Sequence, residues 1–169
     1  MKDPGEVLEA LEDALSTLTE AASEGAVLVE GRRDVAALAA LGVEGSVEVL
    51  NRGTPLLALC DALALRHRTI TVLTDWDEKG DELARQLAAG LRRASVEVDT
   101  ETRDGLRRLT RGSIHAVEEL PSFHRRVSAA AASKGPTVKV ATDWKARKEL
   151  TLARRAIRKQ RGGPPGRRP

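Results

Sequence analysis

Short β-branched runs alternate four times with longer segments of helical composition, and no other feature of the sequence constrains the fold as strongly. The runs are residues 26–30 (AVLVE), 46–50 (SVEVL), 69–74 (TITVLT) and 95–100 (SVEVDT). Helical segments follow them at 32–41, 55–65, 81–93 and 104–110. Strands joined by helix-length crossovers form parallel sheets with right-handed connections. The sequence therefore predicts an α/β, Rossmann-like fold with about four mainly parallel strands and helices on both faces.

Segments outside this alternation suggest the domain boundaries. Apolar residues recur at helical spacing over 5–22, which predicts an amphipathic helix that Gly25 ends. We expect an N-terminal helix at 1–24, an α/β domain at 25–122, a helical extension at 123–161 and a disordered basic tail at 162–169. The extension includes a basic helix from Trp144 to Arg161.

Two local predictions concern how elements begin and end. Thr54 is the expected N-cap of the segment 55–65, with Pro55 at its first position. The segment SIHAVEEL, residues 113–120, is expected to form one more short strand or edge element that Pro121 stops.

The sequence points to the cytosol. Its single cysteine, Cys60, cannot form an intramolecular disulfide and lies in an apolar segment typical of a buried thiol. No run of about 18 apolar residues is present, and the first twenty residues are acidic and amphipathic, unlike a secretory leader. We expect a cytoplasmic protein with no membrane partner.

Charge is distributed unevenly along the chain, although the formal net charge is only +3. The segment 145–169 carries ten Lys or Arg residues and one acidic residue, Glu149. Such asymmetry favours an anionic partner, with nucleic acid first, while a basic tail that only aids solubility is the simpler alternative. Aromatic residues make up 2% of the chain, which disfavours base stacking and favours structured RNA or DNA read by shape and phosphates.

Acidic residues follow two of the predicted strands. Glu30 ends the first, and Asp75 and Asp77 follow the third. The carboxyl ends of parallel strands meet at one edge of a sheet, so these three carboxylates are expected to converge. A divalent cation commonly neutralises such a group, and Mg²⁺, with Mn²⁺ as a substitute, suits hard oxygen ligands.

Two other interpretations of the aspartates were weighed. An EF-hand beginning at Asp75 would require an oxygen ligand and a Glu where the chain has Lys79 and Gln86, which excludes it. A plain helix N-cap stays open, because Asp at this position satisfies free amides and favours the helix dipole. Gly31, directly after Glu30, permits a tight turn and close approach of a ligand.

Two of these segments resemble the motifs of the Toprim domain. VLVEGRRDVAAL (27–38) resembles its strand ending in Glu-Gly, and VLTDWDEKGDELA (72–84) resembles its D-x-D motif with the following glycine. The resemblance covers roughly residues 25–120. It implies a Rossmann-like Toprim fold that binds Mg²⁺ for phosphodiester chemistry. Glu30 would match the general acid-base or metal-binding glutamate, Asp75 and Asp77 the metal-binding aspartates, and Gly31 and Gly80 the turn glycines.

Composition narrows this class. The chain has no Tyr, so it cannot form the tyrosyl-DNA link of a topoisomerase by itself. One Cys and three scattered His do not supply a zinc module, and no G-x-x-x-x-G-K-[ST] loop is present. The chain then resembles small stand-alone Toprim proteins, including primase-like ones and the ribonuclease that matures bacterial 5S ribosomal RNA. Trp76 between the aspartates departs from that ribonuclease and puts identical substrate specificity in doubt.

The resemblance and the charge pattern together favour Mg²⁺-dependent hydrolysis of a phosphodiester, in structured RNA rather than DNA. Arg32, Arg33 and Arg52 lie near strand ends as candidate phosphate contacts, or as ordinary surface charges. His115, near Glu118 and Glu119, is the one histidine of interest; His67 and His124 are isolated.

A second interpretation is a non-catalytic Toprim module that binds Mg²⁺ and nucleic acid, or a ribonucleoprotein partner, as an accessory factor. It is favoured by the lack of a recognisable second catalytic constellation. A nucleotide-binding Rossmann protein ranks last, because G-x-G-x-x-G is absent.

Overall fold

A computed structural model describes residues 3–50 and 53–133 of the chain. The chain divides into two units, residues 1–133 and 134–169, and the architecture reported is that of the first. The basic helix expected from Trp144 to Arg161, the tail at 162–169 and Arg52 lie outside the described residues.

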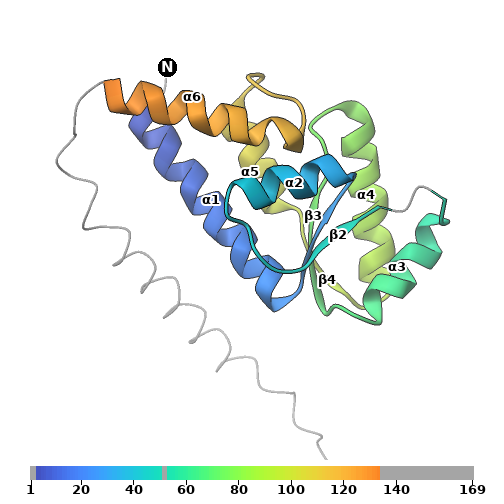
Figure 1. Cartoon of the computed structure of the whole chain (residues 1–169). Helices are drawn as coiled ribbons and strands as arrows, with labels where there is room; N and C mark the ends of the chain where they lie inside the picture. The colour runs from blue at the N-terminus through green and yellow to red at the C-terminus, as the bar shows by residue number, and fades with distance from the viewer. Residues whose placement is uncertain (1–2, 51–52, 134–169) are drawn as a thin grey trace, which may run out of the picture. The chain divides into compact units, whose positions relative to one another are not determined.

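A four-stranded parallel sheet forms the centre of the fold (Figure 1). Its strands are β1 (Ala26–Val29), β2 (Val47–Val49), β3 (Thr69–Leu73) and β4 (Glu97–Asp99). The spatial order is β2-β1-β3-β4, and every neighbouring pair is parallel. The chain therefore leaves β1 in one direction to form β2 and returns past β1 to form β3. The predicted α/β, Rossmann-like fold is confirmed.

Helices cover both faces of this sheet (Figure 1). They are α1 (Pro4–Glu24), α2 (Arg32–Ala40), α3 (Leu56–Ala64), α4 (Glu78–Arg93), α5 (Glu101–Thr110) and α6 (Leu120–Ser133). Successive side chains along the strands point to opposite faces of the sheet. Leu28 and Val72 pack with α3 and α4, whereas Val27 and Val29 pack with the other helices. All four strand residues are fully buried. Two aliphatic cores thus sandwich the sheet, as its Val- and Leu-rich strands predict.

Two helix boundaries, the end of α1 and the start of α4, have clear local causes. The N-terminal helix ends at Gly25, where a Cβ atom would lie 2.2 Å from the carbonyl oxygen of Thr69, so only glycine lets this turn pass the start of β3. The helix α4 begins at Glu78, three residues earlier than predicted, because the Asp77 side chain accepts a hydrogen bond from the Gly80 N–H at 2.7 Å.

Two local predictions are wrong. Residues 113–120 form no strand; they form a loop and the 3₁₀ helix η1 (Val117–Glu119). Pro121 lies in the first turn of α6, where a missing N–H breaks no helical hydrogen bond. At α3, Pro55 takes the N-cap position in place of Thr54. The boundary expected at residue 122 falls inside α6, which packs against α1.

Among the described residues, no helix is both long enough and apolar enough to cross a bilayer.

The sandwich predicts unequal costs for two leucine truncations. Leu28→Ala removes a fully buried side chain from β1, an inner strand of the sheet, and is expected to lower the free energy of unfolding by about 2–5 kcal/mol. Leu65→Ala is the matched control, because Leu65 is 89% exposed and its loss is expected to change stability by less than about 0.5 kcal/mol. Urea unfolding measures both, and equal costs would contradict this core.

Candidate metal and catalytic site at the carboxyl edge of the sheet

The candidate site lies where the strand order reverses. Glu30 directly follows β1, and Asp75 follows β3 by one intervening residue, Thr74. Since β1 and β3 are adjacent and parallel, both side chains are placed at the same edge of the sheet. Open α/β sheets bind their ligands at this switch point, outside the carboxyl ends of the strands.

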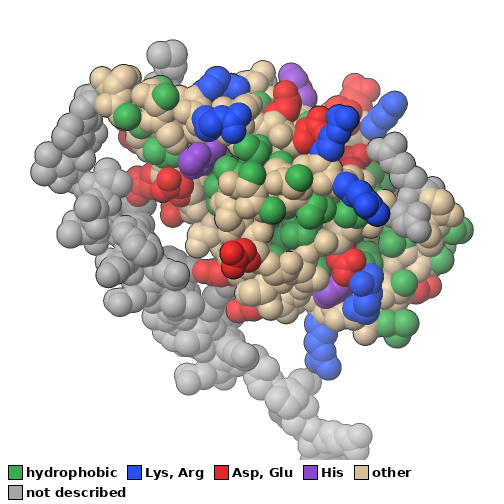
Figure 2. All heavy atoms as spheres, in the orientation of Figure 1, with side chains coloured by type: hydrophobic (Ala, Val, Ile, Leu, Met, Phe, Trp, Pro, Cys, Tyr) green, Lys and Arg blue, Asp and Glu red, His purple; other side chains and the backbone are tan. Residues whose placement is uncertain are grey.

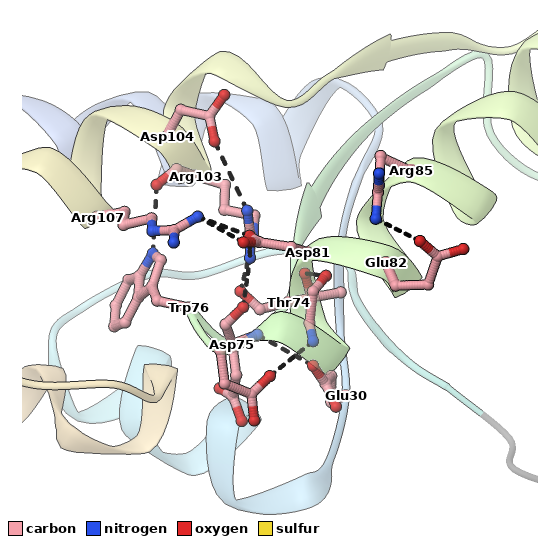
Figure 3. A network of polar contacts seen from close by, with 12 residues as sticks. Glu30, Thr74, Asp75, Trp76, Asp81, Glu82, Arg85, Arg103, Asp104 and Arg107 are labelled. Carbon is pink, nitrogen blue, oxygen red and sulfur yellow. Dashed lines mark hydrogen bonds and ion pairs between the residues drawn. The ribbon is translucent and has the colours of Figure 1, made fainter.

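The structure brings Glu30 and Asp75 into direct contact. The Asp75 N–H donates to Glu30 Oε1 at 3.0 Å (Figure 3), and Asp75 Oδ1 accepts from the Val117 N–H at 3.0 Å. Each carboxylate therefore uses an oxygen to accept from backbone. The convergence predicted from the sequence is present for this pair.

Burial and the charges of neighbouring carboxylates raise the pKa of both carboxyl groups. Burial is the main cause for Glu30, and the negative charges of Asp75, Asp77 and Asp34 add to it. Burial also raises the pKa of Asp75, with the charges of Asp77, Glu118 and Glu119 adding. The hydrogen bonds from the Asp75 and Val117 N–H groups partly oppose these effects.

Asp77 has both roles that the sequence left open. It caps α4 through the Gly80 N–H, and its exposed carboxylate still lies close enough to act on Glu30 and Asp75 electrostatically. Gly80 is needed for this arrangement: a Cβ atom there would lie 2.1 Å from the Asp75 carbonyl oxygen. Gly31 begins α2, with its N–H directed to the third residue of that helix, Asp34.

Sequence reasoning missed Asp34. Its side chain is 5% exposed and Oδ2 accepts from the Gly31 N–H at 2.9 Å. Burial raises its pKa, the Asp75 and Glu118 charges add, and hydrogen bonds from the backbone of Gly31 and Glu118 oppose the rise. Its position three residues after Gly31 is typical of a helix-capping carboxylate, which is the signal that could have found it.

Arg103 was also missed, although its side chain contacts the aspartate loop, residues 74–77. Its guanidinium is buried and donates to the backbone carbonyls of Thr74, at 3.0 Å, and Asp75 (Figure 3). It also donates to Asp81 Oδ1 at 2.7 Å. The sequence carries a weak signal: Arg103 lies at helical spacing from Leu106 and Thr110, on the buried stripe of α5.

The other candidate residues lie farther out. Arg32 and Arg33 are exposed at the start of α2, and Arg33 Nη1 lies 3.8 Å from Glu118 Oε1. His115 makes contacts through its backbone: its carbonyl accepts from the Trp76 N–H at 2.9 Å, and its N–H donates to Glu119 Oε2. His67 pairs with Glu48 and His124 with Glu12.

The candidate ligands are of the chemical type that Mg²⁺ prefers, but they are few. Within residues 3–50 and 53–133, no group of three or more His, Cys, Asp or Glu side chains is arranged to hold a metal ion. Mg²⁺ does not require such a cage, because it is commonly held by one or two carboxylates, waters and substrate phosphates. Glu30 and Asp75 supply hard oxygens of this kind, with Asp77 beside them.

Fold and site define a class: a four-stranded parallel α/β protein with a half-buried carboxylate pair at the switch point of its sheet. No known protein-family model matches the chain. It is 43% identical to the UPF0292 protein of Pyrococcus horikoshii over 62% of this chain and 78% of that protein. It is 35% identical to the UPF0292 protein of Methanosarcina barkeri over 69% of this chain and 81% of that one. The chain belongs to the UPF0292 family.

A solved structure of a protein from Aquifex aeolicus is similar to this fold. Its TM-score is 0.56 and its sequence is 25% identical, over 64% of this chain and 95% of the Aquifex chain. The names of these relatives state no activity.

Gly80 provides a test of the aspartate loop. Gly80→Ala places a methyl group against the Asp75 backbone and is expected to lower the free energy of unfolding by about 1–3 kcal/mol. Gly105→Ala, inside α5 with open space at its Cβ, is the control and is expected to raise it by about 0.5–1 kcal/mol. Urea unfolding of the two variants should therefore give shifts of opposite sign.

The raised pKa of Glu30 predicts how stability depends on pH. Because the folded state holds its proton more tightly than the unfolded state, this group's contribution is greatest below its ordinary pKa of about 4.3 and is lost as pH rises through the folded-state pKa. Glu30→Gln is expected to raise the free energy of unfolding at neutral pH in EDTA and to flatten its fall with pH.

Urea unfolding at a series of pH values measures this effect, with exposed Glu44→Gln as the control. The control is expected to follow the wild-type profile. A Glu30→Gln variant that is less stable than wild type at neutral pH would contradict a strained, repelling carboxylate pair.

Proposed function

We propose that this UPF0292 protein is a Toprim-like, Mg²⁺-dependent phosphodiester hydrolase of the cytoplasm that acts on structured RNA in preference to DNA. The observation that carries the proposal is the Glu30–Asp75 contact at the switch point of the sheet. The two motifs that resemble Toprim supply these residues in the order and strand context of that domain.

The raised pKa of Glu30 suits general acid-base work. A carboxyl group whose pKa is moved toward neutrality can exchange protons at working pH more effectively than an ordinary surface glutamate. Its Oε1 is held by the Asp75 N–H, which fixes the carboxyl group at the sheet edge. Glu30 would activate water or protonate the leaving oxygen of the phosphodiester.

Asp75, Asp77 and Glu30 would hold the cation. Mg²⁺ would supply neutralisation of charge on the phosphoryl group. Without a cation, this edge repels a polyanion, because Glu30, Asp34 and Asp75 lie within electrostatic reach of one another. A divalent ion therefore accounts both for the cost of assembling these carboxylates and for the approach of a phosphate.

Basic residues near the site are candidate contacts for the substrate backbone. Arg32 and Arg33 lie at the start of α2. A hollow of about 530 Å³ between α4 and α5 is lined by Arg85 and Arg92 among acidic side chains. On the face that Figure 2 shows, Lys and Arg side chains are mixed with acidic ones and form no continuous basic surface. This supports local phosphate contacts within the described residues, with the basic segment 145–169 as a second source of affinity.

One observation favours the accessory role as a second candidate. The described residues contain no preformed group of three metal-ligating side chains. A module that binds Mg²⁺ together with a nucleic acid or a ribonucleoprotein, without cutting, requires no more than the carboxylate pair.

Amide substitutions separate these functions. Glu30→Gln and the double variant Asp75→Asn/Asp77→Asn keep side-chain oxygens that can accept the backbone hydrogen bonds, while removing charge. Each is expected to lower Mg²⁺-dependent cleavage of a structured RNA by at least about 100-fold. Asp61→Asn, exposed on α3, is the control and is expected to cleave like wild type.

Cleavage is followed with structured RNA and duplex DNA, in Mg²⁺, Mn²⁺ or EDTA. Cleavage that survives the substitutions, or that persists in EDTA, would exclude this site. Cation-dependent binding without cleavage by the wild type would support the accessory role. A thermal midpoint that Mg²⁺ and Mn²⁺ leave unchanged would contradict both candidates.

A further inference from the structure

We propose that Arg103 is a positioning residue for the carboxylate site: its guanidinium fixes the loop that presents Asp75 to a divalent cation. The effect on the cation rests on the proposed function, whereas the fixing of the loop does not. Neither the motifs nor the charge pattern of the sequence assigns a role to this arginine.

The burial of Arg103 requires an explanation. Its side chain is 4% exposed, and a buried arginine is costly unless every donor group finds a partner. Nε donates to the Thr74 carbonyl, and one terminal nitrogen donates to both the Asp75 carbonyl and Asp81 Oδ1. Two of these three acceptors are consecutive backbone carbonyls at the end of β3.

Arg103 holds Asp75 through its backbone carbonyl. The Asp75 carbonyl faces Arg103 and its N–H faces Glu30 (Figure 3), while its carboxylate accepts from the Val117 N–H. Every polar group of this residue is therefore engaged, and Arg103 holds the one on the core side. Loss of this hydrogen bond would allow the peptide plane that orients the Asp75 carboxylate to move.

The tie between α5 and the loop is reciprocal. The Trp76 indole N–H donates to the backbone carbonyl of Arg103 at 3.3 Å, and Trp76 is itself 5% exposed. The side chain and backbone of one α5 residue thus contact three successive residues of the loop, Thr74, Asp75 and Trp76. A planar fork of donors is needed for the carbonyl contacts, and lysine cannot reproduce it.

Asp81 and Arg107 allow the positioning role of Arg103 to be tested separately from its positive charge. Asp81 accepts from both Arg103 and Arg107, so it offsets positive charge beside the loop. Burial alone would raise the pKa of Asp81, but the hydrogen bonds from Arg103 and Arg107 outweigh it and lower the pKa. Of the two arginines, the hydrogen bonds to the β3 loop come from Arg103, which makes Arg107 a matched control on the same helix.

The test compares Arg103→Lys with Arg107→Lys and with Leu106→Ala, a fully buried truncation on the same helix that leaves the guanidinium in place. The first readout is amide hydrogen exchange over residues 74–77 and 115–117, without metal. Arg103→Lys is expected to speed it roughly tenfold, as for loss of a charge-assisted hydrogen bond. Arg107→Lys is expected to leave it at the wild-type rate.

The second readout is the Kd for Mn²⁺ at a temperature where each variant is folded. Arg103→Lys is expected to weaken binding about tenfold, the loss typical of residues that orient metal ligands. Arg107→Lys and Leu106→Ala are expected to keep the wild-type Kd. Should Arg103→Lys not fold, Asp81→Ala, which removes one acceptor of the guanidinium, is expected to shift both readouts in the same direction.

The proposal is overturned if Arg103→Lys keeps wild-type exchange in these segments, or if Leu106→Ala weakens Mn²⁺ binding equally, since general destabilisation would then be the cause. If the wild type binds neither Mn²⁺ nor Mg²⁺, the proposed function fails. Hydrogen exchange alone then decides whether Arg103 holds the loop.

Discussion

The parallel pairing of β1 with β3 is the constraint on which the rest of the structure depends. It places the residues that follow the two strands at one edge, so Glu30 and Asp75 lie close together whatever their charges. Packing of both sheet faces fixes the register, because a slip of one residue would turn Leu28 and Val72 out of their core. The aliphatic sandwich therefore holds two like charges together that would separate in an open chain.

Backbone amides keep this repulsion tolerable. Glu30, Asp34, Asp75 and Asp77 accept from the N–H groups of Asp75, Gly31, Val117 and Gly80 respectively. Such bonds favour the ionised carboxylates, yet for Glu30, Asp34 and Asp75 burial and mutual charge still raise the pKa. The site is preorganised at a cost in stability, which is typical of positions selected for binding or chemistry.

The fold followed from the sequence because its signals were local. Val- and Leu-rich runs alternating with helical segments predicted the strands, the parallel sheet and the shared edge of Glu30 and Asp75. Asp77 as a helix cap was equally local. The segment 113–120 could not be predicted in this way, because the short SIHAVEEL run carries alternating β-like residues but pairs with Asp75 and Trp76 through its backbone. Arg103 could not be predicted for a related reason: in sequence it resembles the exposed arginines around it, and only tertiary packing makes it a buried donor.

The tripeptide Asp75-Trp76-Asp77 shows why the site and the core cannot be treated separately. Asp75 meets Glu30, Trp76 packs in the core against the α1, α5 and α6 side of the sheet, and Asp77 caps α4. Three consecutive residues thus tie the sheet edge to both helix layers. Trp76 is in this light a structural residue: its buried ring, hydrogen-bonded to the Arg103 carbonyl, anchors the peptide between the two aspartates.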